Sequence, residues 1–206
     1  MHRKATTNRS AFLALGLLLA VSAPARAQEM IFHCDIAHTK ATFNLSATMH
    51  TVHGIFLARR CELRFDPATG KLSGAIVFDA NTGNTGNDGR DAKMHKDVLQ
   101  SDRFPDLIFH PDHVEGKVSD SGSSTVQVHG MFGVHGGEHE LAVPVVVIRE
   151  GERWTATTQF PVPYVAWGMK NPSTVFLHVG DSIEAQFHGM GTVETPPVAP
   201  PPPNPR

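Results

Sequence analysis

Residues 41–49 alternate strictly between apolar and polar side chains. The apolar positions are Ala41, Phe43, Leu45, Ala47 and Met49. A period of two is that of a β-strand with one buried face and one face in water. Comparable runs recur along the chain and are separated by clusters of Gly, Pro, Asn and Asp, which is typical of short antiparallel strands. The sequence therefore predicts an all-β fold.

The pattern predicts between eight and ten strands in a single domain. In residues 72–78, Leu72, Ile76 and Phe78 share one side, and a turn signature with Pro67 and Gly70 comes before them. We expect strands at residues 30–36, 41–49, 52–60, 72–78, 107–110, 125–134, 141–148, 154–162 and 182–189. This number and rhythm favour an extended antiparallel barrel of eight strands.

One segment, residues 81–102, breaks the alternation. Asn87 or Asp88 can cap a short helix that places Met94, Val98 and Leu99 on one side. A helix this short depends on packing for its stability. We expect a helix and loop insertion near one end of the barrel, where it would act as a lid.

The N-terminus has the pattern of a secretory signal peptide over residues 1–27. Basic residues come first, an apolar run follows at 11–21, and cleavage is expected after Ala27. The run is too short to span a bilayer, and we expect no membrane-spanning segment. Cleavage would leave 14 Lys and Arg against 20 Asp and Glu, a formal charge of −6. Such a charge disfavours nucleic acid and anionic membranes as partners through bulk electrostatics.

The two cysteines, Cys34 and Cys61, suit a disulfide in an exported protein. A bridge of this loop length would stabilise the fold by roughly 3–4 kcal/mol. Two unpaired thiols on different strands are the alternative, because the sequence gives no Cα separation.

Residues 135–139, His-Gly-Gly-Glu-His, satisfy the letters of an inverted zinc-protease motif. That site needs a continuous helix, whereas paired glycines between two strand-like runs favour a hairpin turn. The pairs His50/His53 and His110/His113 are also loosely metal-like, but we interpret the histidines as scattered surface residues and expect no metal site. We find no catalytic motif and no phosphate-binding loop, and we expect neither enzymatic activity nor a cofactor.

The predicted inward faces combine Phe and aliphatic side chains with small residues. The small ones are Ala41, Ala47, Gly74, Ala156 and Ala185. Small inward residues leave volume that a long apolar chain could fill. The alternative is that the same faces simply pack against one another.

Five stretches occur in the order found in the YceI-like family, and the resemblance spans nearly the whole chain from about Met30 to Val193. They are DIAHTKATF (35–43), GAIVFD (74–79), TGNDGRD (85–91), FPDLIF (104–109) and GMFGVHG (130–136). Residues 164–173, YVAWGMKNPS, resemble a subgroup of the family. The resemblance implies a lipocalin-like barrel at 28–194, exported to the periplasm or secreted. It also implies a bound isoprenoid quinone, isoprenyl phosphate or other long-chain amphiphile, no catalytic residues, and a homodimer as one form. The proline-rich composition of residues 195–206, which is not part of the family pattern, predicts a disordered tail.

We expect the ligand to contact apolar interior residues. These are Phe43, Leu45, Ile76, Phe78, Leu107, Phe109, Phe132, Phe160 and Phe187, with Trp167 at the mouth. Asn87 and Arg90 are the candidates for the head group, although Arg90 could instead form a salt bridge with Asp88 or Asp91.

The chain departs from the family pattern at residues 137–140, where Gly-Glu-His-Glu replaces a basic residue and a proline. Carboxylates there would repel an anionic head group and favour a neutral quinone or a fatty amide. The rival interpretation is a histidine-rich accessory protein for metal or redox functions, without a lipid.

Overall fold

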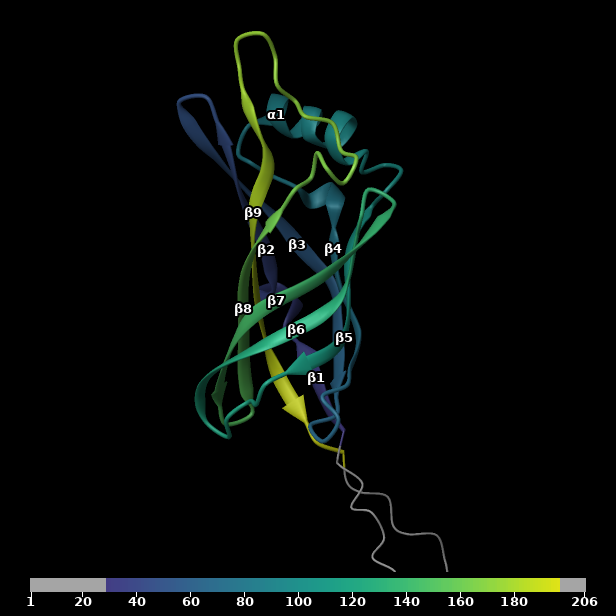
Figure 1. The fold of residues 1–206 in the computed structure, drawn as a ribbon, viewed down its shortest axis with the longest axis vertical. Coiled ribbons are helices and arrows are strands. Elements are labelled where there is room, and N and C mark those ends of the chain that lie inside the picture. Colours follow the sequence, from purple (N-terminus) through teal and green to yellow (C-terminus); the bar gives the residue numbers. More distant parts are fainter. Residues whose placement is uncertain (1–28, 197–206) are drawn as a thin grey trace, which may run out of the picture.

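The computed structural model describes residues 29–196 and has nine antiparallel strands in one sheet (Figure 1). The strands are β1 (Met30–Cys34), β2 (Lys40–Ala47), β3 (His50–Phe65), β4 (Leu72–Asp79), β5 (Asp106–Glu115), β6 (Gly122–Val134), β7 (Gly137–Glu150), β8 (Arg153–Val162) and β9 (Val179–Glu194). The helical elements are η1 (Ile36–His38), η2 (Ala80–Thr82), α1 (Asp88–Lys93) and η3 (Met94–Leu99).

The sheet closes on itself as an eight-stranded barrel. Its order runs β3-β2-β9-β8-β7-β6-β5-β4, and β4 pairs back onto β3. The ninth strand, β1, lies between β3 and β9 as a continuation of β2, since both β1 and β2 pair with those two strands. Between them, η1 is capped by the Asp35 side chain, which accepts a hydrogen bond from the Ala37 amide. The predicted all-β barrel of eight strands is confirmed, with one strand position divided in two.

Several strands differ in length from the sequence prediction. The expected strand at 107–110 extends to Glu115 through Pro111, and a register shift between Pro111 and His113 accommodates the proline. The strand expected at 30–36 ends at Cys34, because Asp35 caps η1 and η1 begins at Ile36. Met49 is also placed wrongly by the alternation. It lies in the β2–β3 turn with φ of 68° and 97% of its surface exposed.

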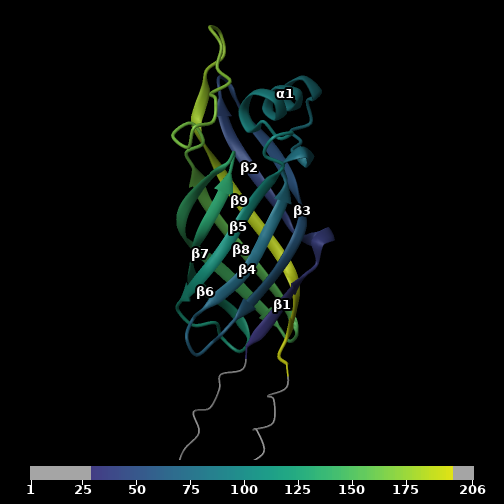
Figure 2. The same cartoon turned by 90° about the vertical axis from the view of Figure 1, so that its right-hand side faces the viewer.

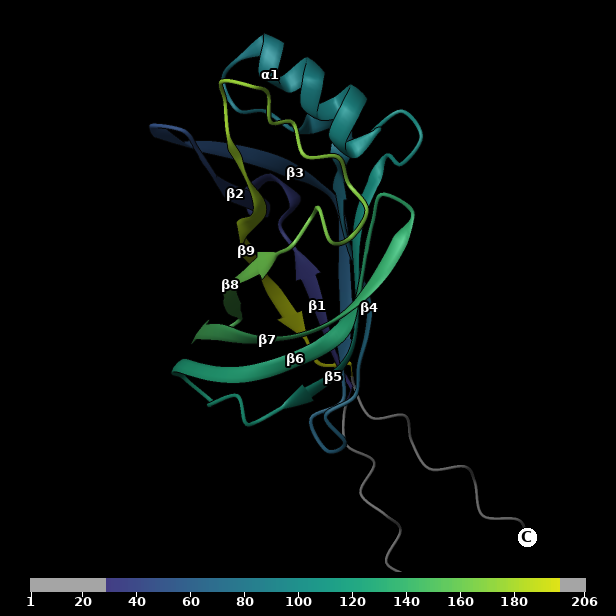
Figure 3. The same cartoon turned by 45° about the horizontal axis from the view of Figure 1, so that its top comes forward.

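The predicted insertion lies across one end of the barrel, which we call the apical end (Figure 3). Asn87 caps α1 as expected, because its side chain accepts a hydrogen bond from the Arg90 amide. The helix continues into η3, which has π-helical geometry and ends at Gln100 in the left-handed conformation. Met94, Val98 and Leu99 all pack on the barrel core, as predicted from their spacing.

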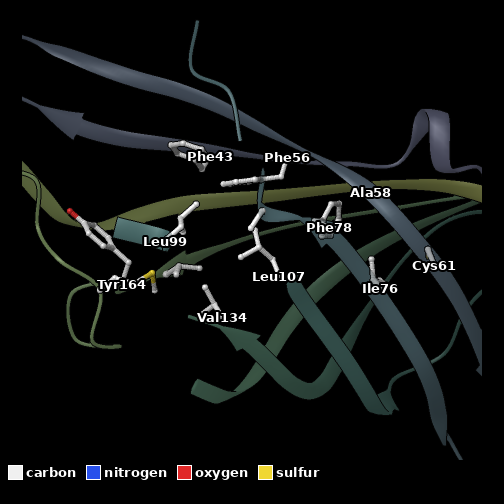
Figure 4. Close-up of a cluster of buried hydrophobic side chains, with 13 residues drawn as sticks. Phe43, Phe56, Ala58, Cys61, Ile76, Phe78, Leu99, Leu107, Val134 and Tyr164 are labelled. Carbon is white, nitrogen blue, oxygen red and sulfur yellow. The ribbon is translucent and has the colours of Figure 1, made fainter. Parts of the chain in front are cut away.

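Two clusters of buried side chains line the barrel interior from end to end. The cluster at the apical end includes Phe43, Phe56, Leu107 and Tyr164 (Figure 4). The second cluster lies toward the opposite end and is dominated by valines. Its buried members are Leu72, Val114, Val126, Val128, Val143, Val145 and Val147. The apolar interior thus runs along the whole barrel axis. Figure 2 shows the strands of the barrel from a second side.

The motif at residues 135–139 forms the β6–β7 turn. His135 and Gly136 occupy the two turn positions with φ of 51° and 77°, a conformation that glycine adopts without strain. The predicted hairpin is confirmed, and the two histidines do not lie on a helix.

Cys34 at the end of β1 is bonded to Cys61 of β3 as a disulfide, with Cα atoms 5.5 Å apart. The bridge ties β1 to the barrel wall.

The expected leader at 1–27 and all but the first residues of the expected tail at 195–206 lie outside the described residues. Among residues 29–196, no helix is long and apolar enough to cross a membrane.

Candidate functional site

An apolar cavity of about 600 Å³ occupies the barrel interior. All nine strands contribute side chains to its wall. At the apical end the wall includes Met94 and Leu99 of η3, and at the other end it includes Met30 and Val118. A volume of this size is in the range of sites that enclose an organic ligand. The inward faces therefore do not simply fill the barrel by packing against one another.

Small side chains on the inward faces explain where the volume comes from. Ala41, Ala47, Ala156 and Ala185 all lie on the cavity wall, and their side chains are too short to reach those of the opposite wall. Gly74, which we expected among them, is exposed and does not line the cavity. A Cβ atom at position 74 would lie 2.1 Å from the main-chain oxygen of Glu62. Glycine at position 74 therefore allows β4 to approach β3 closely.

Nine of the ten expected ligand-contacting residues lie on the cavity wall. They are Phe43, Leu45, Ile76, Phe78, Leu107, Phe109, Phe132, Phe160 and Phe187. Four of them, Phe43, Ile76, Phe78 and Leu107, are seen together in Figure 4. The barrel thus places them where a ligand would lie, and their contact with one stays a prediction.

Trp167 is not part of the wall. Its indole ring stacks on the imidazole of His139, with ring centroids 3.9 Å apart and planes 7° apart. The ring also lies 6.1 Å from that of Phe132, which pairs with His139 across β6 and β7. Trp167 therefore covers the β6–β7 hairpin and does not line the cavity.

Four polar wall residues lie at the apical end, in and just before α1. Thr85, Asn87, Arg90 and Lys93 line the cavity there. Among the described residues, Arg90 and Lys93 are the charged members of the wall apart from the titratable His50, and no Asp or Glu belongs to it. This end of the cavity can receive a polar or anionic group.

The Arg90 side chain is held by Thr85. It donates from Nε to the Thr85 hydroxyl over 2.7 Å and from Nη2 to the Thr85 main-chain oxygen over 2.8 Å. Thr85 in turn donates from its amide and its hydroxyl to the buried carboxylate of Asp91. In the described part of the chain, Arg90 forms no ion pair with Asp88 or Asp91, so the direct salt bridge considered from the sequence is absent.

The insertion itself is anchored to the barrel. Asn84 exchanges two main-chain hydrogen bonds of 3.0 Å with Ile55 of β3, and His95 bonds through Nε2 to the Gly83 oxygen over 2.9 Å. Lys93 is partly engaged by Asp97 at 3.4 Å. Arg90 and Lys93 are therefore presented from a fixed support.

The carboxylates of the β6–β7 hairpin do not reach the cavity. Glu138 and Glu140 are exposed and absent from the wall, whereas Leu141, Val143 and Val145 of the same strand line it. Alternation along β7 directs these two glutamates outward. The repulsion of an anionic head group inferred from residues 137–140 therefore has no basis in the structure.

The sequence interpretation missed some wall residues. Val52 and Phe56 of β3 are buried wall residues, and their spacing with Ala58 carried the required signal. Tyr164, also on the wall, donates from its hydroxyl to the Gly180 oxygen over 2.7 Å. Burial raises the pKa of Tyr164 to about 12, and the charge of Asp181 acts in the same direction. Tyr164 and Lys93 lie outside the strands, where no periodicity identifies them.

The histidines are distributed over the barrel. His53 bonds to the Asn44 side chain over 2.6 Å, His38 to Asp35 over 2.7 Å, and His33 lies 3.3 Å from Glu194. Within residues 29–196, no group of three or more His, Cys, Asp or Glu side chains is placed to hold a metal ion.

The sequence profile of the YceI-like domain matches residues 32–189. The chain belongs to the YceI-like family. Among solved structures, this YceI-like protein is similar to BcnA of Burkholderia cenocepacia, with 20% identity, a TM-score of 0.64, and coverage of 78% of this chain and 100% of BcnA. It is also similar to a polyisoprenoid binding domain from Saccharophagus degradans implicated in plant cell wall breakdown, with 14% identity, a TM-score of 0.64, and coverage of 81% and 98%.

At these identities the likeness to both solved structures shows the shared fold. A comparison with curated protein sequences gives no match.

Proposed function

We propose that this YceI-like protein is an exported binding protein that holds an isoprenoid-type lipid or similar long-chain amphiphile inside its barrel, without catalysing a reaction. The observation that carries the proposal is the continuous apolar cavity of about 600 Å³. The name of the Saccharophagus degradans neighbour, a polyisoprenoid binding domain, supports the same ligand class.

The free energies of apolar burial and of association favour a long ligand chain over a short one. Each buried methylene contributes about 0.8 kcal/mol, while association costs on the order of 4–15 kcal/mol. A chain of about six carbons would gain about 5 kcal/mol, close to the lowest cost, so it would be retained poorly. A chain two or three times longer exceeds most of that range. The apolar wall thus suits a polyisoprenoid or long acyl chain.

The head group of the ligand would lie at the apical end, beside Asn87, Arg90 and Lys93. The guanidinium and ammonium groups can donate to quinone carbonyl oxygens or to phosphate oxygens. An isoprenoid quinone and an isoprenyl phosphate both fit, and the two cations together favour an anionic head group over a neutral one. No carboxylate of the wall opposes it.

The proposed location is the periplasm or the cell exterior. It is supported by the leader-like residues 1–27 and by the two cysteines, which suit an oxidising compartment. In this division of the chain, residues 28–194 form the binding domain and residues 195–206 form a proline-rich tail. A homodimer stays a prediction.

Native mass spectrometry of the protein purified without detergent from its own source tests the proposal. We expect one extra mass per chain that organic solvent removes and that a chelator leaves in place. The control is the solvent-stripped protein, which should take up a polyprenol or quinone again. An extra mass removed only by a chelator, or stripped protein that takes up no lipid, would contradict the proposal.

A further inference from the structure

Two apolar loop tips lie at the apical end, and one of them, the β8–β9 loop, projects beyond α1. The β2–β3 turn presents Met49, which is 97% exposed, and the β8–β9 loop presents Val175 and Phe176, which are 92% and 94% exposed. In Figures 1 and 2 the β8–β9 loop extends past the helix, away from the body of the barrel. We call Met49 together with residues 175–177 the apical tip. Side chains this large and this exposed mark a surface that contacts an apolar partner.

Hydrogen bonds hold the apical tip in a defined conformation. The Thr48 amide donates to the His178 oxygen over 2.9 Å, and the His178 amide donates to the Thr48 hydroxyl over 2.9 Å. These bonds join the two loops next to Met49 and Leu177. The Thr174 amide donates to the Leu177 oxygen over 2.9 Å, which closes a turn with Val175 and Phe176 at its outermost positions. The exposed side chains are therefore held outward by the loop conformation.

The base of the β8–β9 loop is continuous with the cavity. Pro172 and Leu177 belong to the cavity wall, whereas Val175 and Phe176 do not. Asn171 fixes this base by donating to the Val179 oxygen over 3.1 Å and to the Asp181 carboxylate over 2.6 Å. A partner that receives the apical tip is thereby brought next to the apical end of the cavity.

From these observations we infer that the apical tip inserts into the surface of a lipid bilayer, so that the ligand passes between membrane and cavity at that point. The tip is too small for a stable protein partner, because such interfaces bury about 800 Å² on each side and use about 20–30 residues. A few apolar side chains at the tip of a loop are enough for reversible contact with the acyl boundary of a bilayer.

The charges around the tip suit phospholipid head groups. Residues 163–180 and 44–61 contain no Asp or Glu, while Lys170, His50 and His178 flank the apolar residues and are exposed. This local balance differs from the acidic excess of the chain as a whole. The contact we infer depends on apolar insertion, with the charge of Lys170 in support.

The purpose of this contact rests on the proposed function, since a long-chain isoprenoid lipid is poorly soluble in water. The contact itself is measured separately. The naturally processed, exported protein is floated on a density gradient with vesicles of phosphatidylethanolamine and phosphatidylglycerol. The test variant is Val175→Ser with Phe176→Ser. The matched control is Leu57→Ser with Ile148→Ser, which changes two exposed apolar residues on the barrel wall.

We expect the wild type and the control to float with the vesicles. The test variant should bind the vesicles at least about tenfold more weakly. All three should still take up farnesol from solution. Wild-type protein that does not float, or equal loss in test and control variants, would overturn the inference. A concentration-dependent dimer that only the test variant disrupts, without flotation of the wild type, would overturn it in favour of self-association. Flotation without uptake of any isoprenoid would leave the membrane contact standing and contradict the proposed function.

Discussion

Arg90 donates two hydrogen bonds to Thr85, one from Nε to the hydroxyl and one from Nη2 to the main-chain oxygen. This fork fixes one edge of the guanidinium at the apical end of the cavity. Because Thr85 also donates to the buried carboxylate of Asp91, the acid orients the arginine through the threonine without pairing with it. The remaining N–H groups of Arg90 keep their capacity to bind a ligand oxygen.

Replacing Arg90 by leucine should weaken binding of an isoprenyl phosphate by about tenfold to a hundredfold, because a charge-assisted hydrogen bond is worth about 1.5–3 kcal/mol. Titration of solvent-stripped protein with geranylgeranyl phosphate measures the effect. Arg103→Leu is the control, since Arg103 lies over the Phe104 ring and is not on the cavity wall. Equal affinities of the two variants would exclude Arg90 from head-group binding.

Filling the cavity should compete with the ligand. Ala156→Leu adds three carbons on the wall, so we expect the ligand-free protein to gain about 0.5–2 kcal/mol in stability while lipid uptake falls. Ala142→Leu makes the same change on an exposed position of β7 and should leave uptake unaltered. Urea unfolding and lipid loading are compared for the two variants. Unchanged loading of Ala156→Leu would place the ligand elsewhere.

The ring of Phe43 lies directly over Gly54, its partner across β2 and β3, since a Cβ atom at position 54 would be 2.2 Å from two ring carbons. Gly54→Ala should therefore destabilise the protein by about 1–3 kcal/mol through overpacking.

The cost of Gly54→Ala should shrink in a Phe43→Leu background, a coupling that a double-mutant cycle by urea unfolding detects. Gly89→Ala in α1 serves as the control, because its Cβ would meet no atom closer than 3.6 Å. If Gly54→Ala and Gly89→Ala lower the free energy of unfolding by the same amount, the ring of Phe43 does not pack on Gly54.

Tyr164 should make stability depend on pH in the alkaline range. Burial, with the charge of Asp181, raises its pKa to about 12 from the ordinary value of 10.0. The folded state thus holds this proton more tightly than the unfolded state does. The resulting stability is complete below about pH 10 and is lost as the pH rises toward 12.

Tyr164 is the single tyrosine of the chain, so its absorbance titration reports this group alone. We expect a midpoint near 12 in the folded protein and near 10 in urea. In Tyr164→Phe, the fall in unfolding free energy between these pH values should be smaller. A folded-state midpoint near 10 would refute the buried hydroxyl.

The strands and their inward faces were predictable because a period of two fixes side-chain direction. Phe43 and Leu45, or Phe160 and Phe187, needed no knowledge of the partner strand to be placed inside. The prediction for Met49 was wrong because β2 ends at Ala47 and Met49 lies in the following turn with a positive φ. The prediction for Gly74 was wrong because the main-chain oxygen of Glu62, on the neighbouring strand β3, leaves no room for a Cβ atom. The sequence does not reveal this neighbour.

The apical residues depend on loop conformation, which no period specifies. Asn87 was found because helix caps have a recognisable chemistry, and Arg90 because it follows that cap. Its partner Thr85 was not found, since only the turn at Gly86 brings the threonine back to the guanidinium. Trp167 was assigned to the mouth from its size and its glycine neighbour, whereas its indole stacks on His139 and does not line the cavity.

A crystal structure of the protein isolated from its own source, without detergent, would show directly whether the barrel holds a lipid. We expect continuous electron density for one chain-like molecule along the cavity, from the valine-rich end past Phe43 and Leu107, with its polar end beside Arg90. Walls that meet with no space between them, or a cavity that stays empty after soaking with a long-chain isoprenoid, would contradict this expectation.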